Sequence, residues 1–118
     1  MGSRATTVCA TASGRVVTVQ PVGDLDLATS DDLRARLSEA ATLSAYLVVL
    51  DLAQVDFLDS TAVGVVVGAH KHLAADGRHL VLCHVGAMPA RVLQITGLLD
   101  LLDVREDSPA LDDESLRH

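Results

Sequence analysis

Aromatic residues are almost missing from this chain, which contains one tyrosine, one phenylalanine and no tryptophan. Hydrophobic residues nevertheless make up 49% of its 118 residues, so the interior must be built from valine, leucine, isoleucine and alanine. Branched aliphatic side chains of this kind commonly fill the space between a sheet and the helices that cover it. The same richness in apolar residues argues against intrinsic disorder, which goes with a polar composition.

Cysteines are scarce, and no hydrophobic run is long. Cys9 and Cys83 do not form a C-x-x-C pair, and the N-terminus lacks the apolar stretch of an export signal. The longest apolar run, 62–69, is far shorter than the roughly 20 residues that span a bilayer. We therefore expect a cytoplasmic protein with reduced thiols and no membrane segment.

Positive charge is also in short supply. The chain has 16 acidic and nine basic residues, and its formal net charge is −7. Nucleic-acid affinity depends on lysine and arginine contacts to phosphates, so an acidic domain of this size is repelled by DNA and RNA. Anionic membrane surfaces are disfavoured for the same reason. The charge balance favours a soluble protein whose partner is another protein.

The hydrophobic pattern predicts the element order β-β-α-β-α-β-α-β. Strands are expected at 6–12, 15–22, 46–52, 79–85 and 101–105, the first two forming a hairpin around Ser13-Gly14. Helices are expected to begin within 27–32 at a hydroxyl cap and at Ser60, and a third helix is expected to have Pro89 in its first turn. A loose fourth helix is expected over 109–117. Strand–helix alternation predicts an α/β fold with a mixed, largely parallel β-sheet of about five strands covered by about four helices.

The length of 118 residues fits one domain over 1–118, with a core at about 6–105 and a polar C-terminal tail or short helix over 106–118.

Two details of the predicted helices concern packing. Gly64 and Gly68 lie one turn apart, so we expect them to bring the second helix close to the sheet. Met88, Val92 and Ile95 are expected to form the inner stripe of the third helix.

The loop 56–61 stands at a strand-to-helix turn, where ligands and chemistry collect in parallel α/β sheets. Ser60 would place its hydroxyl near the first free amides of the helix. A phosphate there would accept hydrogen bonds from those amides and meet the positive end of the helix dipole. Taken alone, the tripeptide Asp59-Ser60-Thr61 is more typical of a simple helix cap.

The segment 23–26 also lies at a strand-to-helix turn. It is expected to bring Asp24 and Asp26 to the same end of the sheet as Ser60, because parallel strands share that edge. Acids beside a seryl hydroxyl could orient it, hold a metal ion bound to a kinase, or repel the product phosphate. A solvated turn whose charges favour the following helix explains the same pair.

Three segments together resemble the STAS domains of bacterial anti-sigma factor antagonists. They are Gly23-Asp24-Leu25-Asp26, the strand 48–52 leading through 55–64, and the late segment 92–98, so that the likeness spans roughly residues 6–105. The resemblance implies that the phosphorylated residue is Ser60, directly after the loop aspartate. Asp59 is then its neighbouring acid, and Asp26 is the acid from the other loop.

Family members often read Asp-Ser-Ser-Gly at this site, whereas this chain has Asp59-Ser60-Thr61-Ala62. Thr61 keeps a hydroxyl and is the less favoured acceptor. Ala62 replaces a common glycine and could crowd a kinase that approaches the backbone closely. Gly64, one turn further on, matches the family pattern.

The resemblance also implies a partner. In this family a serine kinase doubles as the anti-sigma factor. The unmodified antagonist binds that kinase and frees the sigma factor, phosphorylation breaks the partnership, and a separate serine phosphatase resets it. We therefore expect a regulator of transcription in a stress response that performs no catalysis itself and needs no cofactor or metal ion. The expected partner contact surrounds Ser60 and comprises Asp24, Asp26, Asp59, Thr61, Ala62 and Gly64.

Two other classes of function compete with this interpretation. An enzyme is disfavoured because the five histidines show no metal-binding spacing, and because no P-loop or G-x-S-x-G motif is present. A non-switching STAS subunit of a transport or stress-signalling complex remains the alternative. Such a subunit would carry no phosphate on Ser60.

Overall fold

The computed structural model describes residues 7–10, 15–43 and 45–106. The strands are β1 (Thr7–Ala10), β2 (Val16–Gln20), β3 (Leu47–Asp51), β4 (His79–Cys83) and β5 (Asp103–Arg105). The helices are α1 (Ser30–Ala41), α2 (Ser60–Ala75) and α3 (Ala87–Ile95). The predicted order of elements is confirmed. The turn expected at Ser13-Gly14 and the helix expected over 109–117 lie outside the described residues.

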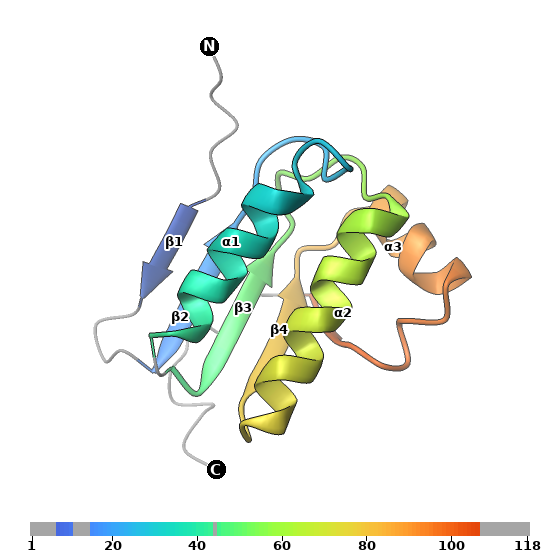
Figure 1. The fold of residues 1–118 in the computed structure, drawn as a ribbon. Coiled ribbons are helices and arrows are strands. Elements are labelled where there is room, and N and C mark those ends of the chain that lie inside the picture. The colour runs from blue at the N-terminus through green and yellow to red at the C-terminus, as the bar shows by residue number, and fades with distance from the viewer. Residues whose placement is uncertain (1–6, 11–14, 44, 107–118) are drawn as a thin grey trace.

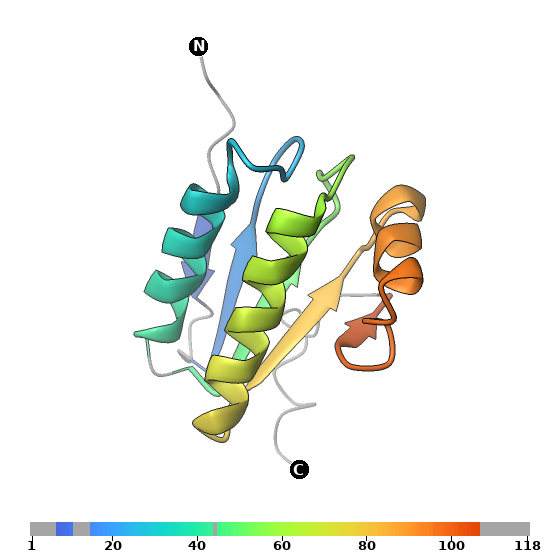
Figure 2. The ribbon, with the colours of Figure 1, turned by 45° about the vertical axis from the view of Figure 1, so that its right-hand side comes forward.

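The five strands form one sheet whose spatial order follows the chain, β1-β2-β3-β4-β5. β1 pairs with β2 in the antiparallel sense, as expected of a hairpin, and β2 to β5 run parallel. α1 and α2 lie side by side across one face of this sheet (Figure 1), and α3 lies beyond α2 on the side of β4 (Figure 2). The predicted α/β class with a mixed, largely parallel sheet is thereby confirmed.

The core has two parts because successive strand residues point to opposite faces of the sheet. Val48 and Leu50 of β3 belong to the large cluster that also contains Leu33 of α1 and Leu73 of α2. A smaller cluster contains strand residues only: Val16, Leu47, Val49, Val81 and Cys83. This second cluster therefore lies on the sheet face turned away from α1 and α2. The nearly continuous apolar run of β3 is explained by burial on both faces.

The inner face of α3 differs from the predicted one. Pro89 and Leu93 are its buried residues, and Val92 is half-buried. Met88 is 55% exposed and Ile95 is 74% exposed, so the prediction that they form the inner stripe was wrong. In this nine-residue helix, apolar residues occupy neighbouring positions, such as Met88 and Pro89 or Val92 and Leu93. The spacing of apolar residues therefore fits two adjacent faces of the helix, and it does not show which of them is buried.

The two glycines of α2 also lie on a different face of the helix from the one that was predicted. Gly64 and Gly68 are exposed, and a Cβ atom added to either would meet nothing within 4 Å. They line a groove of about 490 Å³ between α1 and α2, together with Leu37 and Ala41 of α1. The buried face of α2 consists instead of Ala62, Val63, Val65, Val66 and Leu73. The expectation that the glycines bring α2 close to the sheet was wrong.

Across the described residues, no helix combines the length and the apolar character that crossing a bilayer would require.

Candidate functional site

Two loops run together at the carboxyl end of the parallel strands. One joins β2 to α1 and the other joins β3 to α2, and both rise above the starts of these helices (Figure 1). A parallel bridge pairs Leu25 with Leu58, and both side chains are buried. The Leu25 amide donates to the Phe57 carbonyl at 2.9 Å, and the Asp59 amide donates to the Leu25 carbonyl at 3.0 Å. The structure thus brings the acidic turn 24–26 next to the segment that carries Ser60.

Asp59 joins the two loops through its side chain. Its Oδ1 accepts a hydrogen bond from the Ala62 amide at 3.0 Å, which caps the start of α2. Its Oδ2 accepts a hydrogen bond from the Leu27 amide of the other loop, also at 3.0 Å. The carboxylate is half-buried between these partners. Helix capping is therefore performed by Asp59, and the neighbouring serine is not needed for it.

Ser60 is the first residue of α2 and is exposed. Within residues 7–10, 15–43 and 45–106, no group forms a hydrogen bond with its hydroxyl or with the backbone amides of Ser60 and Thr61. Unbonded amides of this kind are usual in the first turn of a helix and can bind an anion. Thr61 is half-buried, so the more accessible of the two hydroxyls belongs to Ser60.

The two acids of the first loop differ in their surroundings. Asp26 is half-buried, and its Oδ1 accepts from the amide and from the hydroxyl of Thr29, both at 3.2 Å. Asp24 is exposed, and its carbonyl accepts from the Thr29 hydroxyl at 3.0 Å. Asp26 is thus held in place by hydrogen bonds within its own loop.

The hydroxyl cap expected at the start of α1 is not formed. Thr29 occupies the N-cap position, but its side chain accepts no hydrogen bond from an amide of α1. It accepts instead from the Asp26 amide at 3.0 Å. Ser30 is buried and donates to the Leu27 carbonyl at 3.2 Å. Both hydroxyls thus form hydrogen bonds to residues of the loop 24–29.

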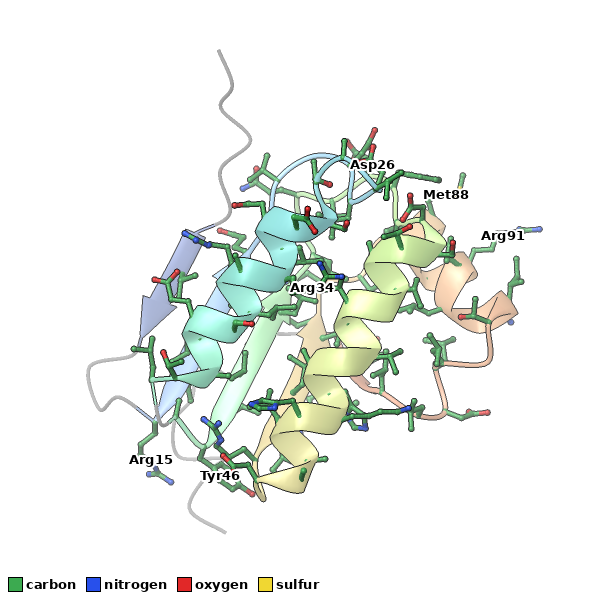
Figure 3. All side chains as sticks on the ribbon, viewed as in Figure 1. Arg15, Asp26, Arg34, Tyr46, Met88 and Arg91 are labelled. Carbon is green, nitrogen blue, oxygen red and sulfur yellow. The ribbon has the colours of Figure 1, made fainter. Side chains whose placement is uncertain are left out.

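Three large apolar side chains are exposed on the loops and the helix start at this end of the sheet. Leu27 is 74% exposed, Phe57 is 41% exposed, and Met88 at the start of α3 is 55% exposed. Asp26 and Met88 lie at the same end of the molecule (Figure 3). Motif-based reasoning missed all three. The signal that could have revealed Leu27 and Phe57 was a further large apolar residue in each loop, besides the buried Leu25 and Leu58.

Ala62 and Gly64, the remaining two residues of the expected partner contact, differ in their exposure. Ala62 is fully buried, so its side chain is not available to a partner. Gly64 lies one turn after Ser60 on the same side of α2 and is exposed at the groove between α1 and α2. The accessible surface at this end of the sheet therefore comprises Leu27, Phe57, Ser60 and Met88, with Asp24 and Gly64 beside them; we call it the loop-end surface.

The sequence profile of the STAS domain matches residues 8–110 of this chain. The chain belongs to the STAS family. This STAS chain is 30% identical over 93 residues to the anti-sigma F factor antagonist of Paenibacillus polymyxa, a match that covers 78% of this chain and 80% of the relative. It is 33% identical over 92 residues to the anti-sigma-B factor antagonist of Bacillus subtilis, covering 78% and 84%.

The STAS fold is equally clear from solved structures. The phosphorylated form of SpoIIAA, a Bacillus cell fate determinant, superposes with a TM-score of 0.72 at 21% identity, over 96% of this chain and 100% of that one. At that identity the structural match shows the fold alone. The sequence matches show that the chain belongs with the anti-sigma factor antagonists of the STAS family, which confirms the resemblance drawn from the three segments.

Proposed function

We propose that this STAS domain is an anti-sigma factor antagonist whose binding to an anti-sigma factor serine kinase is switched by phosphorylation of Ser60. The unmodified protein binds the kinase in the cytoplasm and so frees the sigma factor for transcription. The phosphorylated protein releases the kinase, and a serine phosphatase restores the first state. The chain itself performs no catalysis.

The observation that carries the proposal is the state of the Ser60 hydroxyl. It is exposed and takes no part in the hydrogen bonds that hold the loops together, because Asp59 supplies the cap of α2. A kinase can therefore modify this hydroxyl without breaking a bond on which the fold depends. SpoIIAA, which shares this fold, occurs in a phosphorylated form.

The loop-end surface has the composition of a docking site in the unmodified state. Exposed Leu27, Phe57 and Met88 supply apolar area, and burying one such side chain completely contributes about 1.5–3 kcal/mol. The carboxylates of Asp24 and Asp26 stand at its edge. Apolar centres with polar rims are typical of protein interfaces. A kinase surface with apolar residues and basic groups would complement it.

Phosphorylation would change the charge of this surface more than its shape. A phosphoserine adds about −1.5 to −2 charges beside Asp24, Asp26 and Asp59. A pair of unit charges about 4 Å apart interacts with about 1 kcal/mol in water and about 4 kcal/mol at an effective dielectric of 20. The free amides of Ser60 and Thr61 can bind the new anion, so the domain stays folded while docking is opposed.

Binding of the cognate kinase to the wild type, Ser60→Ala and Ser60→Asp, with Thr61→Ala as the matched control, tests the proposal. Ser60→Ala should bind like the wild type and accept no phosphate from the kinase. Thr61→Ala should bind and be phosphorylated normally. Ser60→Asp should bind at least about tenfold more weakly, which corresponds to about 1.4 kcal/mol. Wild-type affinity of Ser60→Asp, or phosphate mapped to Thr61, would contradict it.

A further inference from the structure

Three side chains of types that can bind metal ions lie close together at the carboxyl ends of β3 and β4. Asp51 and Cys83 end their strands and are register partners, and His84 follows directly. One ligand atom from each residue lies within 4.8 Å of the other two. His84 Nδ1 is 3.1 Å from Asp51 Oδ1 and 3.5 Å from Cys83 Sγ. We propose that Asp51, Cys83 and His84 bind a divalent transition metal ion of the zinc type.

The backbone at His84 takes an unusual conformation that brings the imidazole into this group. His84 has a φ of 54°, and it is the one non-glycine residue with positive φ among the residues that the structure describes. Along a regular strand, the residue after Cys83 would point to the opposite face of the sheet. The left-handed conformation is uncommon for residues other than glycine. Here it places the imidazole on the same side as Cys83 and Asp51.

The three ligand types suit zinc. Thiolate, imidazole and carboxylate bind Zn²⁺ at about 2.0–2.3 Å in tetrahedral sites, so that neighbouring ligand atoms stand roughly 3–4 Å apart. His84 Nδ1 lies 3.1 Å from Asp51 Oδ1 and 3.5 Å from Cys83 Sγ, and both separations already fall in this range. On binding, the ion would displace the thiol proton of Cys83 and any proton on His84 Nδ1, and both would pass to the solvent. A thiolate ligand disfavours Mg²⁺ and Ca²⁺.

Neighbouring groups orient the carboxylate. Gln20 Nε2 donates to Asp51 Oδ2 at 3.3 Å, and the Ala53 amide donates to Asp51 Oδ1 at 3.0 Å. Such second-layer hydrogen bonds are a regular feature of metal sites. Cys83 is fully buried, whereas the side chain of His84 is 34% exposed and that of Asp51 is 13% exposed. An ion would therefore enter from the side of His84, and its fourth coordination position would face the same way.

The experiment is a titration of the full-length, tag-free, reduced and chelator-treated protein with Co²⁺, followed by Zn²⁺. One equivalent of Co²⁺ should produce a thiolate-to-cobalt charge-transfer band in the near ultraviolet and the visible bands of tetrahedral cobalt. Zn²⁺ should displace the cobalt and abolish both. Absence of the charge-transfer band, or of displacement by Zn²⁺, would overturn the proposal.

His84→Asn is the decisive variant, because asparagine tolerates the left-handed backbone and removes the imidazole. It should weaken Zn²⁺ binding at least about tenfold, and Asp51→Asn should do the same. His72→Asn, which removes an exposed imidazole from α2, should leave the affinity unchanged. Equal losses in His84→Asn and His72→Asn would show adventitious binding by surface histidines and overturn the site. Ser60→Ala should bind the metal normally, so the outcome is independent of the proposed phosphorylation switch.

Discussion

Replacing Asp59 by alanine removes two hydrogen-bond acceptors at the carboxyl end of the parallel strands, one that caps α2 and one that joins the two loops. The cap of α2, from the Ala62 amide to Oδ1, is lost together with the bond from the Leu27 amide to Oδ2. Loss of an N-cap side chain costs about 1 kcal/mol, and a typical hydrogen bond contributes about as much again. We therefore expect the free energy of unfolding of Asp59→Ala to fall by about 2 kcal/mol.

Asp59→Asn should give an intermediate result. Asparagine keeps one side-chain oxygen and caps helices about as well as aspartate, so the bond to the Ala62 amide survives. The second acceptor, which serves the Leu27 amide, is lost. The expected destabilisation is about 1 kcal/mol.

Thermal and urea unfolding followed by circular dichroism measures both changes. For a domain of this size, a loss of about 2 kcal/mol lowers the Tm by roughly 6–12 °C. The matched control is Asp56→Ala, which removes an exposed acid three residues upstream and should stay within about 0.5 kcal/mol of the wild type. If Asp59→Ala proved as stable as Asp56→Ala, the role of Asp59 in joining the loops would be refuted.

Three further predictions concern the loop-end surface, the core and the groove. Met88→Ser should weaken kinase binding about tenfold with an unchanged Tm, because this side chain is largely exposed; calorimetric titration and thermal melts measure the two effects. Leu50→Ala should lower the free energy of unfolding by about 2–5 kcal/mol in urea denaturation, because its side chain is fully buried in the main cluster. Gly64→Ala should stabilise α2 by about 0.5–1 kcal/mol, since the added methyl group meets no atom. It should also weaken kinase binding, whereas Gly68→Ala, one turn further from Ser60, should stabilise the protein without that loss.

Much of the fold follows from local signals in the sequence. α2 begins at Ser60, as predicted, because an aspartate cap precedes it, and it ends at Ala75, shortly before Gly77 with a φ of 73°. The buried strand β3 was visible as a continuous apolar run. The meeting of the two loops also follows from the sequence, because parallel strands place their carboxyl ends at one edge.

The predictions from the sequence were wrong where the local pattern allows a side chain two positions, buried or exposed, and where tertiary packing decides between them. In α3, the buried residues are Pro89 and Leu93, although Met88 and Ile95 also stand at a helical spacing. The glycines of α2 were assigned to the sheet, although a small residue suits a groove between helices equally well. Which residue caps a helix is similarly undetermined when acid and hydroxyl stand side by side.

The group formed by Asp51, Cys83 and His84 was outside the reach of motif reasoning for a different reason. Its members come from two strands whose register is set by the assembled sheet, and 32 positions separate Asp51 from Cys83. A left-handed backbone conformation is usually predicted from a glycine, and here it occurs at a histidine, His84. Spacing rules for metal ligands apply within one helix or one loop, so they did not detect a set assembled across strands.

Whether phosphorylation of Ser60 is the switch is decided by the dissociation constant of the complex between the cognate anti-sigma factor kinase and the protein carrying phosphate on Ser60 alone. We expect an affinity at least about 100-fold weaker than that of the unmodified protein, equivalent to about 2.8 kcal/mol, with a circular dichroism spectrum that does not change. Equal dissociation constants for the two forms would refute the proposed switch.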